Sequence, residues 1–507
     1  MAPEVAAVTG GGGSDFPARL TAQVVVCSLI AAFGGLMFGY DIGISGGVTG
    51  MDEFLLRFFP GVYEKKHHTK ENNYCKFDDQ LLQLFTSSLY LAAVVCSWLA
   101  SFSCNKFGRK RTMQMASVFF LVGVGLNAAA QNLGMLIAGR LCLGAGVGFG
   151  NQAVPVFISE ISPAKYRGGL NICFQLMITI GILVANVVNF FTSKLHDGWR
   201  YSLGGAGFPA IFLGLGSLII VETPTSLIER GHKEQGLRSL QRIRGVGAEE
   251  VKKEYDEIVR ATAAQAEHPH PFRNLLTKKS SFPQLFVATI FQVFQQFTGI
   301  NVVMFYAPVL FQTMGLGSDA SLLSSVVMGT VNVLSTLVAV FAVDRFGRRV
   351  LLMQAAVQMV MTQVAMGVLL ATHLGTTNVM AKGYAYLMLA LICLYVMAFA
   401  WSWGPLGWLI ASEVFPAETR TAGFFVAVST NMVCTFIIAQ SFLSMLCTMR
   451  AASFFFFAGW IVVMGSFATF LLPETKGIPI EEMTDKVWKK HWFWRRFYDR
   501  PNPTPAA

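Results

Sequence analysis

Residues 105–111 read NKFGRKR, and residues 344–349 read DRFGRR. Each motif directly follows an apolar stretch that is long enough to cross a bilayer, which takes about 20 residues as a helix. The two motifs therefore mark the same point in two halves of the chain, and they predict an internal repeat.

Two further pairs of motifs continue the repeat in the same order. They are SEISPAKYRG (159–168) with SEVFPAETRTAG (412–423), and VETPTSL (221–227) with PETKG (473–477). Glu160 and Glu222 are 62 residues apart, while Glu413 and Glu474 are 61 residues apart. Two halves built on one plan predict a substrate site between them near the membrane midplane, opened alternately to each side.

Composition indicates a membrane protein. Of 507 residues, 53% are hydrophobic and 13% are charged, whereas a soluble domain carries about 25% charged residues. Twelve segments are candidate spans: 22–45, 80–103, 112–131, 134–158, 168–192, 200–221, 284–312, 321–343, 350–372, 384–411, 421–445 and 453–472. Because only helices can satisfy their own backbone in repeated lipid crossings, we predict an all-α membrane protein with two pseudo-symmetric six-helix halves.

Short loops predict the orientation. Lys and Arg are concentrated in the loops after the second and eighth spans, as in Arg109 and Arg348, which places these loops and both termini in the cytoplasm. The predicted parts are a disordered cytoplasmic tail (1–21), an N-terminal half (22–221) with an extracellular lid (46–79), a cytoplasmic helical linker (222–283), a C-terminal half (284–472) and a cytoplasmic tail (473–507).

Two charged residues lie within predicted spans. Asp41 occurs in FGYDIGISGG (38–47), and Arg140 lies six residues into the fourth span. A charge at a helix centre costs about 2.5–3.5 kcal/mol on insertion scales. Asp41 near Gly39 and Gly43 is compatible with a cap at a helix break, and Arg140 with a side chain that reaches the interface. The alternative is a pair: apolar surroundings favour a protonated carboxylate and a nearby Arg favours its charged form, so a changing distance would take up and release a proton.

Amide side chains are the second polar feature of the spans. They are Gln175, Gln292, Gln295, Gln296, Asn301, Asn332 and Asn431. A single intramembrane amide usually joins two helices, but this number favours a polar cavity. Amides donate and accept hydrogen bonds without charge, which suits an uncharged polyhydroxyl ligand. Trp408 and Phe38 offer aromatic faces for the C–H surface of a sugar, although an intramembrane Trp often serves only in packing.

Together these motifs resemble the sugar porter branch of the major facilitator superfamily. The stretch FGYDIGISGG with its outer lid is most similar to the plant sugar transport protein subfamily and to green-algal hexose/proton symporters. The resemblance implies that Asp41 is the proton site and Arg140 its partner. It implies sugar contacts at nine positions: Phe38, Ile42, Gln175, Gln295, Gln296, Asn301, Asn332, Trp408 and Asn431.

The same resemblance implies a disulfide between Cys75 in the lid and Cys447 at the outer end of the eleventh span. The predicted topology agrees, because both cysteines would face the oxidising exterior; two unrelated cysteines are the alternative. A linked lid would shield the proton site from outside water.

A cytoplasmic gate is the last predicted site. Its candidate residues are Arg109, Arg167, Arg348 and Arg420, with Glu160, Glu222, Glu413 and Glu474. We expect these charges to pair across the halves when the cytoplasmic side is shut, and to separate when it opens. The topology signal alone explains the Arg residues equally well, but not the repeated Glu.

The sequence thus predicts a proton-coupled symporter that imports monosaccharides, with glucose-like hexoses as the expected substrates. A passive sugar facilitator and, behind it, a sugar sensor of the same fold are the alternatives. We expect no enzyme activity, no nucleic-acid partner and no cofactor, with the proton as co-substrate. The protein is expected to act as a monomer in the lipid bilayer of the plasma membrane, with the vacuolar membrane as an open alternative.

Overall fold

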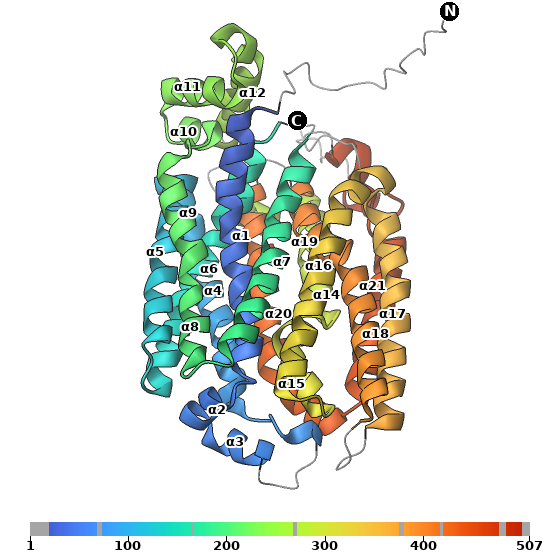
Figure 1. Cartoon of the computed structure of the whole chain (residues 1–507). Helices are drawn as coiled ribbons and strands as arrows, with labels where there is room; N and C mark the ends of the chain where they lie inside the picture. Colours follow the sequence, from blue (N-terminus) through green and yellow to red (C-terminus); the bar gives the residue numbers. More distant parts are fainter. Residues whose placement is uncertain are drawn as a thin grey trace, which may run out of the picture.

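The computed structural model describes residues 20–67, 73–163, 166–266, 271–374, 380–415, 419–475 and 483–498. Within these ranges the regular elements are helices, and they form one elongated bundle (Figure 1). Eleven helices of the described part are long and apolar enough to cross a membrane. The predicted tail 1–21 lies outside the described residues except for its last two positions.

The N-terminal half supplies five of these spans. Its helices are α1 (Ala22–Val48), α4 (Gln80–Phe107), α5 (Arg109–Ala128), α6 (Leu133–Ile161), α7 (Arg167–Thr192), and α8 (Gly198–Gly205) continued by α9 (Gly207–Ile219). The predicted span 112–131 corresponds to α5, which is present and packs along α6 but is not among the eleven. Its first turns read RKRTMQ, and this polar start lowers its hydropathy.

The C-terminal half contains two broken spans. Its helices are α14 (Phe282–Phe297), α15 (Ile300–Thr313), α16 (Ser318–Phe346), α17 (Arg348–His373), α18 (Lys382–Ala400), α19 (Trp403–Glu413), α20 (Arg420–Met449) and α21 (Ala452–Phe470). Gly299, with φ of 83°, separates α14 from α15, and a turn at Trp401 and Ser402 separates α18 from α19. Broken helices are tolerated at membrane depth where their free backbone groups find partners in the protein or line a cavity.

The repeated motif of the sequence is also a repeated geometry. Gly108 (φ 92°) separates α4 from α5, and Gly347 (φ 87°) separates α16 from α17, a conformation that favours glycine. Glu222 accepts hydrogen bonds from the first backbone N–H groups of α5, at 3.2 Å from Arg109 N. Glu474 does the same for α17, at 3.1 Å from Arg348 N. Each carboxylate thus caps the positive end of a helix within its own half.

Smaller helices cover the two ends of the bundle (Figure 1). One end, which we call the lid end, carries α2 (Asp52–Phe58), α3 (Pro60–His67) and a helical turn at Asn73–Cys75. The other, the linker end, carries α10 (Pro224–Glu229), α11 (Lys233–Arg244), α12 (Ala248–Ala266) and α13 (Pro271–Thr277). Phe54 of α2 is fully buried against Phe85 and Trp199, which fixes the lid on the N-terminal half.

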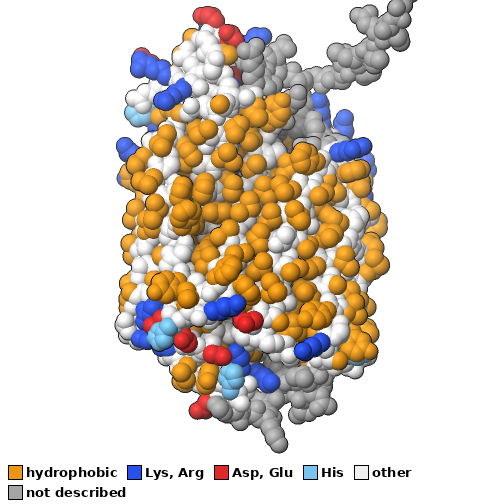
Figure 2. All heavy atoms as spheres, in the orientation of Figure 1, with side chains coloured by type: hydrophobic (Ala, Val, Ile, Leu, Met, Phe, Trp, Pro, Cys, Tyr) orange, Lys and Arg blue, Asp and Glu red, His pale blue; other side chains and the backbone are white. Residues whose placement is uncertain are grey.

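An apolar belt surrounds the bundle between these ends. Figure 2 shows hydrophobic side chains over the middle of one face, with most charged side chains near the two ends. Large apolar side chains such as Ile219 and Phe341 are 75% and 78% exposed. Such a surface is stable in lipid and would aggregate in water, so the chain is a multi-pass membrane protein.

Candidate functional site

A buried ion pair lies inside the N-terminal half. Arg140 Nη1 donates to Asp41 Oδ1 at 2.6 Å, and the two residues are 0% and 2% exposed. The guanidinium also lies over the Phe85 ring, 4.0 Å from its centroid. Nε and Nη2 of Arg140 have no hydrogen-bond partner among the described residues. The pair is therefore held by a single hydrogen bond, and losing either charge would leave the other buried and uncompensated.

Helix α1 runs unbroken past Asp41 to Val48, so Asp41 does not cap a helix break. The neighbouring glycines have another role, since a Cβ at Gly39 would overlap the backbone of Ile178 in α7. Small residues allow the two helices to approach closely. Arg140 is buried within α6, so it is not an interfacial side chain either.

All nine predicted substrate residues line one central cavity between the halves. It takes in about 590 Å³ of space between atoms, part of which is open to solvent. Gln175, Phe38 and Ile42 come from the N-terminal half; the other six come from the C-terminal half. Phe38 and Ile42 flank Asp41 in α1, so the cavity wall directly adjoins the buried pair.

The amides on the C-terminal side form a connected network. Asn431 Nδ2 donates to Gln292 Oε1 at 2.8 Å and to Gln295 Oε1 at 2.7 Å. Gln292 donates to the carbonyl of Gly407, and Gln295 to those of Trp403 and Gly404. These carbonyls belong to α19, next to the break that follows α18. The network therefore holds these amides against the backbone of α19.

Beyond this network, Asn301 donates to Gln296 across the break between α14 and α15. Asn332 Nδ2 lies 3.9 Å from the sulfur of Met304. These amides and Gln175 retain further donors and acceptors toward the cavity, so the wall offers neutral hydrogen-bonding groups to a ligand.

Sequence reasoning missed the rest of the cavity wall. It consists of Tyr90, Ile178, Ile182, Ile300, Met304, Phe305, Phe399 and Thr435. Tyr90 is the most informative of these, because its ring contacts both Phe38 (6.4 Å between centroids) and Phe305 (5.5 Å). A buried Tyr hydroxyl in an apolar span was the available signal, since such a group usually needs a partner.

A second, smaller cavity continues from the first toward the linker end. It is lined by Pro155, Asn171, Phe174, Gln175, Pro405, Trp408 and Leu409. Gln175 and Trp408 belong to both cavities, and the Trp408 ring meets Phe174 edge-on at 6.1 Å between centroids. This aromatic contact lies between the central cavity and the linker end.

Hydrogen bonds join the two halves at the lid end. Ser87 of α4 donates to Gln440 of α20 at 2.6 Å. Asn186 of α7 donates to the Ser325 carbonyl of α16 at 3.1 Å. Since α4 and α16 begin at the lid end, and α7 and α20 finish there, these contacts hold the halves together on that side of the cavity.

The lid adds a covalent link. The predicted disulfide between Cys75 and Cys447 is present and ties the lid to α20. The Tyr74 hydroxyl donates to the carbonyls of Leu370 and Leu374 at 3.4 and 3.3 Å, so the lid also contacts α17. Burial raises the pKa of the Tyr74 phenol, which therefore stays a neutral donor.

The predicted gate residues lie at the linker end, and the contacts described for them stay within one half or reach the segment that follows it. Arg109 Nη2 pairs with Glu160 at 2.8 Å, and its Nη1 pairs with Glu229 of the linker at 2.8 Å. Glu222 and Glu474 cap helices of their own halves. Pairing across the halves stays a prediction.

Of the remaining gate residues, Arg348 is buried at the start of α17 and Arg420 is partly buried at the start of α20. The side chains of Arg167 and Glu413 lie outside the described part of the structure.

Comparisons with known proteins agree with this architecture. Residues 27–487 match the family model described as "Sugar (and other) transporter". Sugar transport protein 6 of Arabidopsis thaliana is 60% identical over 491 residues, which cover 97% of this chain and 96% of the relative. Sugar transport protein MST4 of Oryza sativa subsp. japonica is 58% identical over 491 residues, covering 96% and 95%.

Solved structures with this fold include the proton:xylose symporter XylE bound to 6-bromo-6-deoxy-D-glucose. It is 25% identical, with a TM-score of 0.77 and coverage of 91% of this chain and 98% of XylE. The inward-open conformation of XylE from E. coli matches with a TM-score of 0.70 at 25% identity, covering 91% and 99%. Of these two states, the ligand-bound one is more similar to the present structure.

Proposed function

The chain belongs to the sugar transporter family, and on that premise we propose that it is a proton-coupled symporter that imports monosaccharides, with glucose-like hexoses as its main substrates. The observation that carries the proposal is the buried pair of Asp41 and Arg140 directly behind the wall of an amide-lined cavity. Its relatives and its family are sugar transporters and not enzymes.

Coupling follows from the cost of the buried pair. With Arg140 in contact, Asp41 is stabilised as a carboxylate. When a conformational change lengthens this single contact, the desolvated carboxylate favours its protonated form and takes up a proton. Arg140 remains charged throughout, because a guanidinium does not deprotonate in proteins. The proton is the co-substrate, and its entry brings about 2.3 kcal/mol per 100 mV of membrane potential.

The chemistry of the cavity supports an uncharged sugar. Its polar lining consists of amides and two hydroxyls, from Gln175, Gln295, Gln296, Asn301, Asn332, Asn431, Tyr90 and Thr435. These groups match a polyhydroxyl ligand, whereas a carboxylate or phosphate ligand would call for Lys or Arg. Trp408, Phe38 and Phe399 offer aromatic faces to the C–H surface of a pyranose ring. The 6-bromo-6-deoxy-D-glucose bound to XylE is a ligand of this class.

In an alternating-access cycle, the present structure is a state in which the halves are joined at the lid end. With the lid end closed by the disulfide and by hydrogen bonds between the halves, the sugar would leave past Phe174 and Trp408 toward the linker end. We assign the linker end and both termini to the cytoplasm, and the lid to the outside of the plasma membrane. One chain supplies the whole cavity, so the monomer is the transporting unit.

Radiolabelled glucose uptake in a transporter-deficient host tests the proposal. We expect the internal concentration to exceed the external one at acidic external pH, and a protonophore to abolish this accumulation. Unlabelled monosaccharides should compete, and sugar acids should not. Equal concentrations on both sides, unaffected by the protonophore, would instead identify a passive facilitator.

A further inference from the structure

The last described segment of the chain, residues 483–498, is strongly basic and follows the final span. It contains five Lys and Arg residues and one acidic residue, Asp485. All five basic side chains are exposed, and they are Lys486, Lys489, Lys490, Arg495 and Arg496. The transport cycle described above uses none of them.

The segment is fixed against the bundle by its aromatic residues. Trp488 and Trp494 are 0% and 1% exposed. Trp494 Nε1 donates to the Leu471 carbonyl at 2.8 Å, immediately after α21. The Tyr498 hydroxyl donates to the Ser280 carbonyl at 2.8 Å, just before α14. The basic side chains are therefore presented from a docked segment and not from a free tail.

A third tryptophan indicates where segment 483–498 lies relative to the bilayer. Trp492 Nε1 donates to the carbonyl of Phe470, the last residue of the final span, at 3.1 Å. Its side chain is nevertheless 64% exposed, and the Phe470 side chain is 62% exposed. An exposed Trp at the end of an apolar belt is typical of the bilayer interface. The segment thus lies where lipid headgroups begin.

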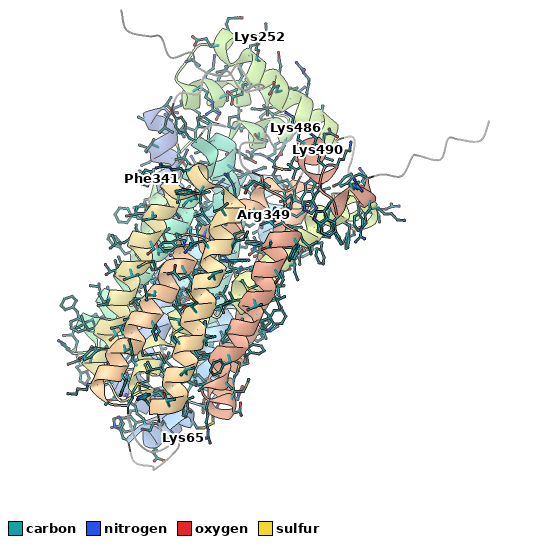
Figure 3. All side chains as sticks on the ribbon, turned by 90° about the vertical axis from the view of Figure 1, so that its right-hand side faces the viewer. Lys65, Lys252, Phe341, Arg349, Lys486 and Lys490 are labelled. Carbon is teal, nitrogen blue, oxygen red and sulfur yellow. A yellow bond between two sulfur atoms is a disulfide. The ribbon has the colours of Figure 1, made fainter. Side chains whose placement is uncertain are left out.

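We propose that segment 483–498 is a docking surface for anionic phospholipid headgroups. A cluster of four to eight basic residues directly after a span fits the phosphates of an anionic leaflet, which the proposed orientation makes the cytoplasmic one. Figure 3 shows Lys486 and Lys490 at the end of the bundle, with Arg349 nearer its middle. Lys252 on α12 lies further out along the bundle axis than Lys486 and Lys490.

Lipid binding to the purified full-length protein tests this proposal. The probe is the melting temperature in phosphatidylcholine nanodiscs with increasing fractions of phosphatidylglycerol, together with the amount of phosphatidylglycerol retained by the protein in native mass spectrometry. Each basic residue near the surface contributes about fivefold in affinity. The quadruple variant should therefore retain little phosphatidylglycerol and should show little of the rise in melting temperature that this lipid causes. Its four changes are Lys489→Gln, Lys490→Gln, Arg495→Gln and Arg496→Gln.

The matched control is Lys252→Gln with Lys253→Gln, two exposed basic residues of the linker helix α12. This variant should bind anionic lipid as the unmodified protein does. The proposal would be overturned if the quadruple variant retained as much phosphatidylglycerol as the unmodified protein does. It would also be overturned if soluble glycerophosphoglycerol raised the melting temperature as much as the lipid does, because that would indicate a site for free phosphate. A Trp492→Ala variant that retains sugar uptake but shows weaker lipid binding would support the assigned depth. Sugar uptake is measured separately, so failure here leaves the proposed transport function untouched.

Discussion

The two polar regions beside the central cavity are built in opposite ways. In the N-terminal half, Asp41 and Arg140 lie on the continuous helices α1 and α6 and share one hydrogen bond. In the C-terminal half, uncharged amides such as Asn431 and Gln295 lie next to broken helices and are joined in a network. The charged pair is costly and sparsely satisfied, whereas the amide network is neutral and well satisfied.

This difference suggests a division of labour. A sparsely satisfied charge responds strongly to small changes in its surroundings, as a proton switch requires. A satisfied amide network holds its geometry, as recognition of a polyhydroxyl ligand requires. Mutations in the two regions should then affect different transport parameters, and the following experiments test that separation.

The largest effect is expected from Asp41→Asn. The amide is close in size to the carboxyl group but takes up no proton, so concentrative uptake should be lost while sugar exchange across the membrane persists. The lost driving force amounts to about 2.3 kcal/mol per 100 mV, or about 50-fold in accumulation. Accumulation and counterflow in proteoliposomes measure the two activities. Undiminished accumulation by this variant would refute the coupling role.

A smaller effect is expected from Asn431→Ala. This change leaves the buried Gln292 and Gln295 oxygens without their amide donor, at a cost of about 1–3 kcal/mol, or about 5- to 150-fold in KM for sugar. The maximal accumulation ratio should remain, because the ion pair is untouched.

Gln358→Ala is the matched control for this amide variant. Gln358 donates from a partly buried position on α17 to the Leu394 carbonyl and does not line the cavity, and its loss should leave the KM unchanged. If Asn431→Ala lost accumulation at saturating sugar, the two regions would not have separate roles in sugar binding and proton coupling.

We expect the lid to affect proton coupling and not sugar binding. In Cys447→Ser the lid loses its link to α20, so outside water reaches the ion pair more easily. We expect the pH dependence of uptake to shift by at most about one unit, or about 1.4 kcal/mol, with little change in sugar KM at saturating proton concentration. Cys393→Ser, which alters a free cysteine of α18, is the control. An unchanged pH profile would show that the lid does not shield Asp41.

The sequence allowed prediction of those site residues whose polarity differs from that of the span around them. Asp41, Arg140 and the cavity amides are polar residues in apolar spans, so their positions were visible without a structure. The repeated motifs predicted the two halves for the same reason. The apolar wall residues such as Phe305 and Ile182 were missed because an apolar residue in an apolar span carries no such contrast.

Local geometry was the other part that sequence did not reveal. The pairing of Glu222 and Glu474 with Arg side chains across the halves stays a prediction, but sequence did not reveal that both also accept from backbone N–H groups at helix starts. Spacing along the chain does not distinguish a side-chain partner from a backbone one. Likewise, spacing along the chain does not reveal that Gln295 donates to the backbone carbonyls of Trp403 and Gly404.

The smallest effect is expected at Asp52, an exposed carboxylate that tests whether burial distinguishes Asp41. Burial alone would raise the pKa of Asp52, but hydrogen bonds from Lys66 at 2.7 Å and His67 at 3.1 Å bring it below its ordinary value. Its stabilising contribution is therefore present above the ordinary carboxyl pKa and is lost as pH falls through the lowered value.

Since the Asp52 side chain is 49% exposed, Asp52→Asn should cost at most about 1 kcal/mol at neutral pH. Melting curves should show this deficit at pH 7 and its disappearance once the pH falls below the lowered pKa, while accumulation stays intact because no buried charge has changed. Lost accumulation in Asp52→Asn would mean that a carboxylate need not be buried beside Arg140 to drive uptake.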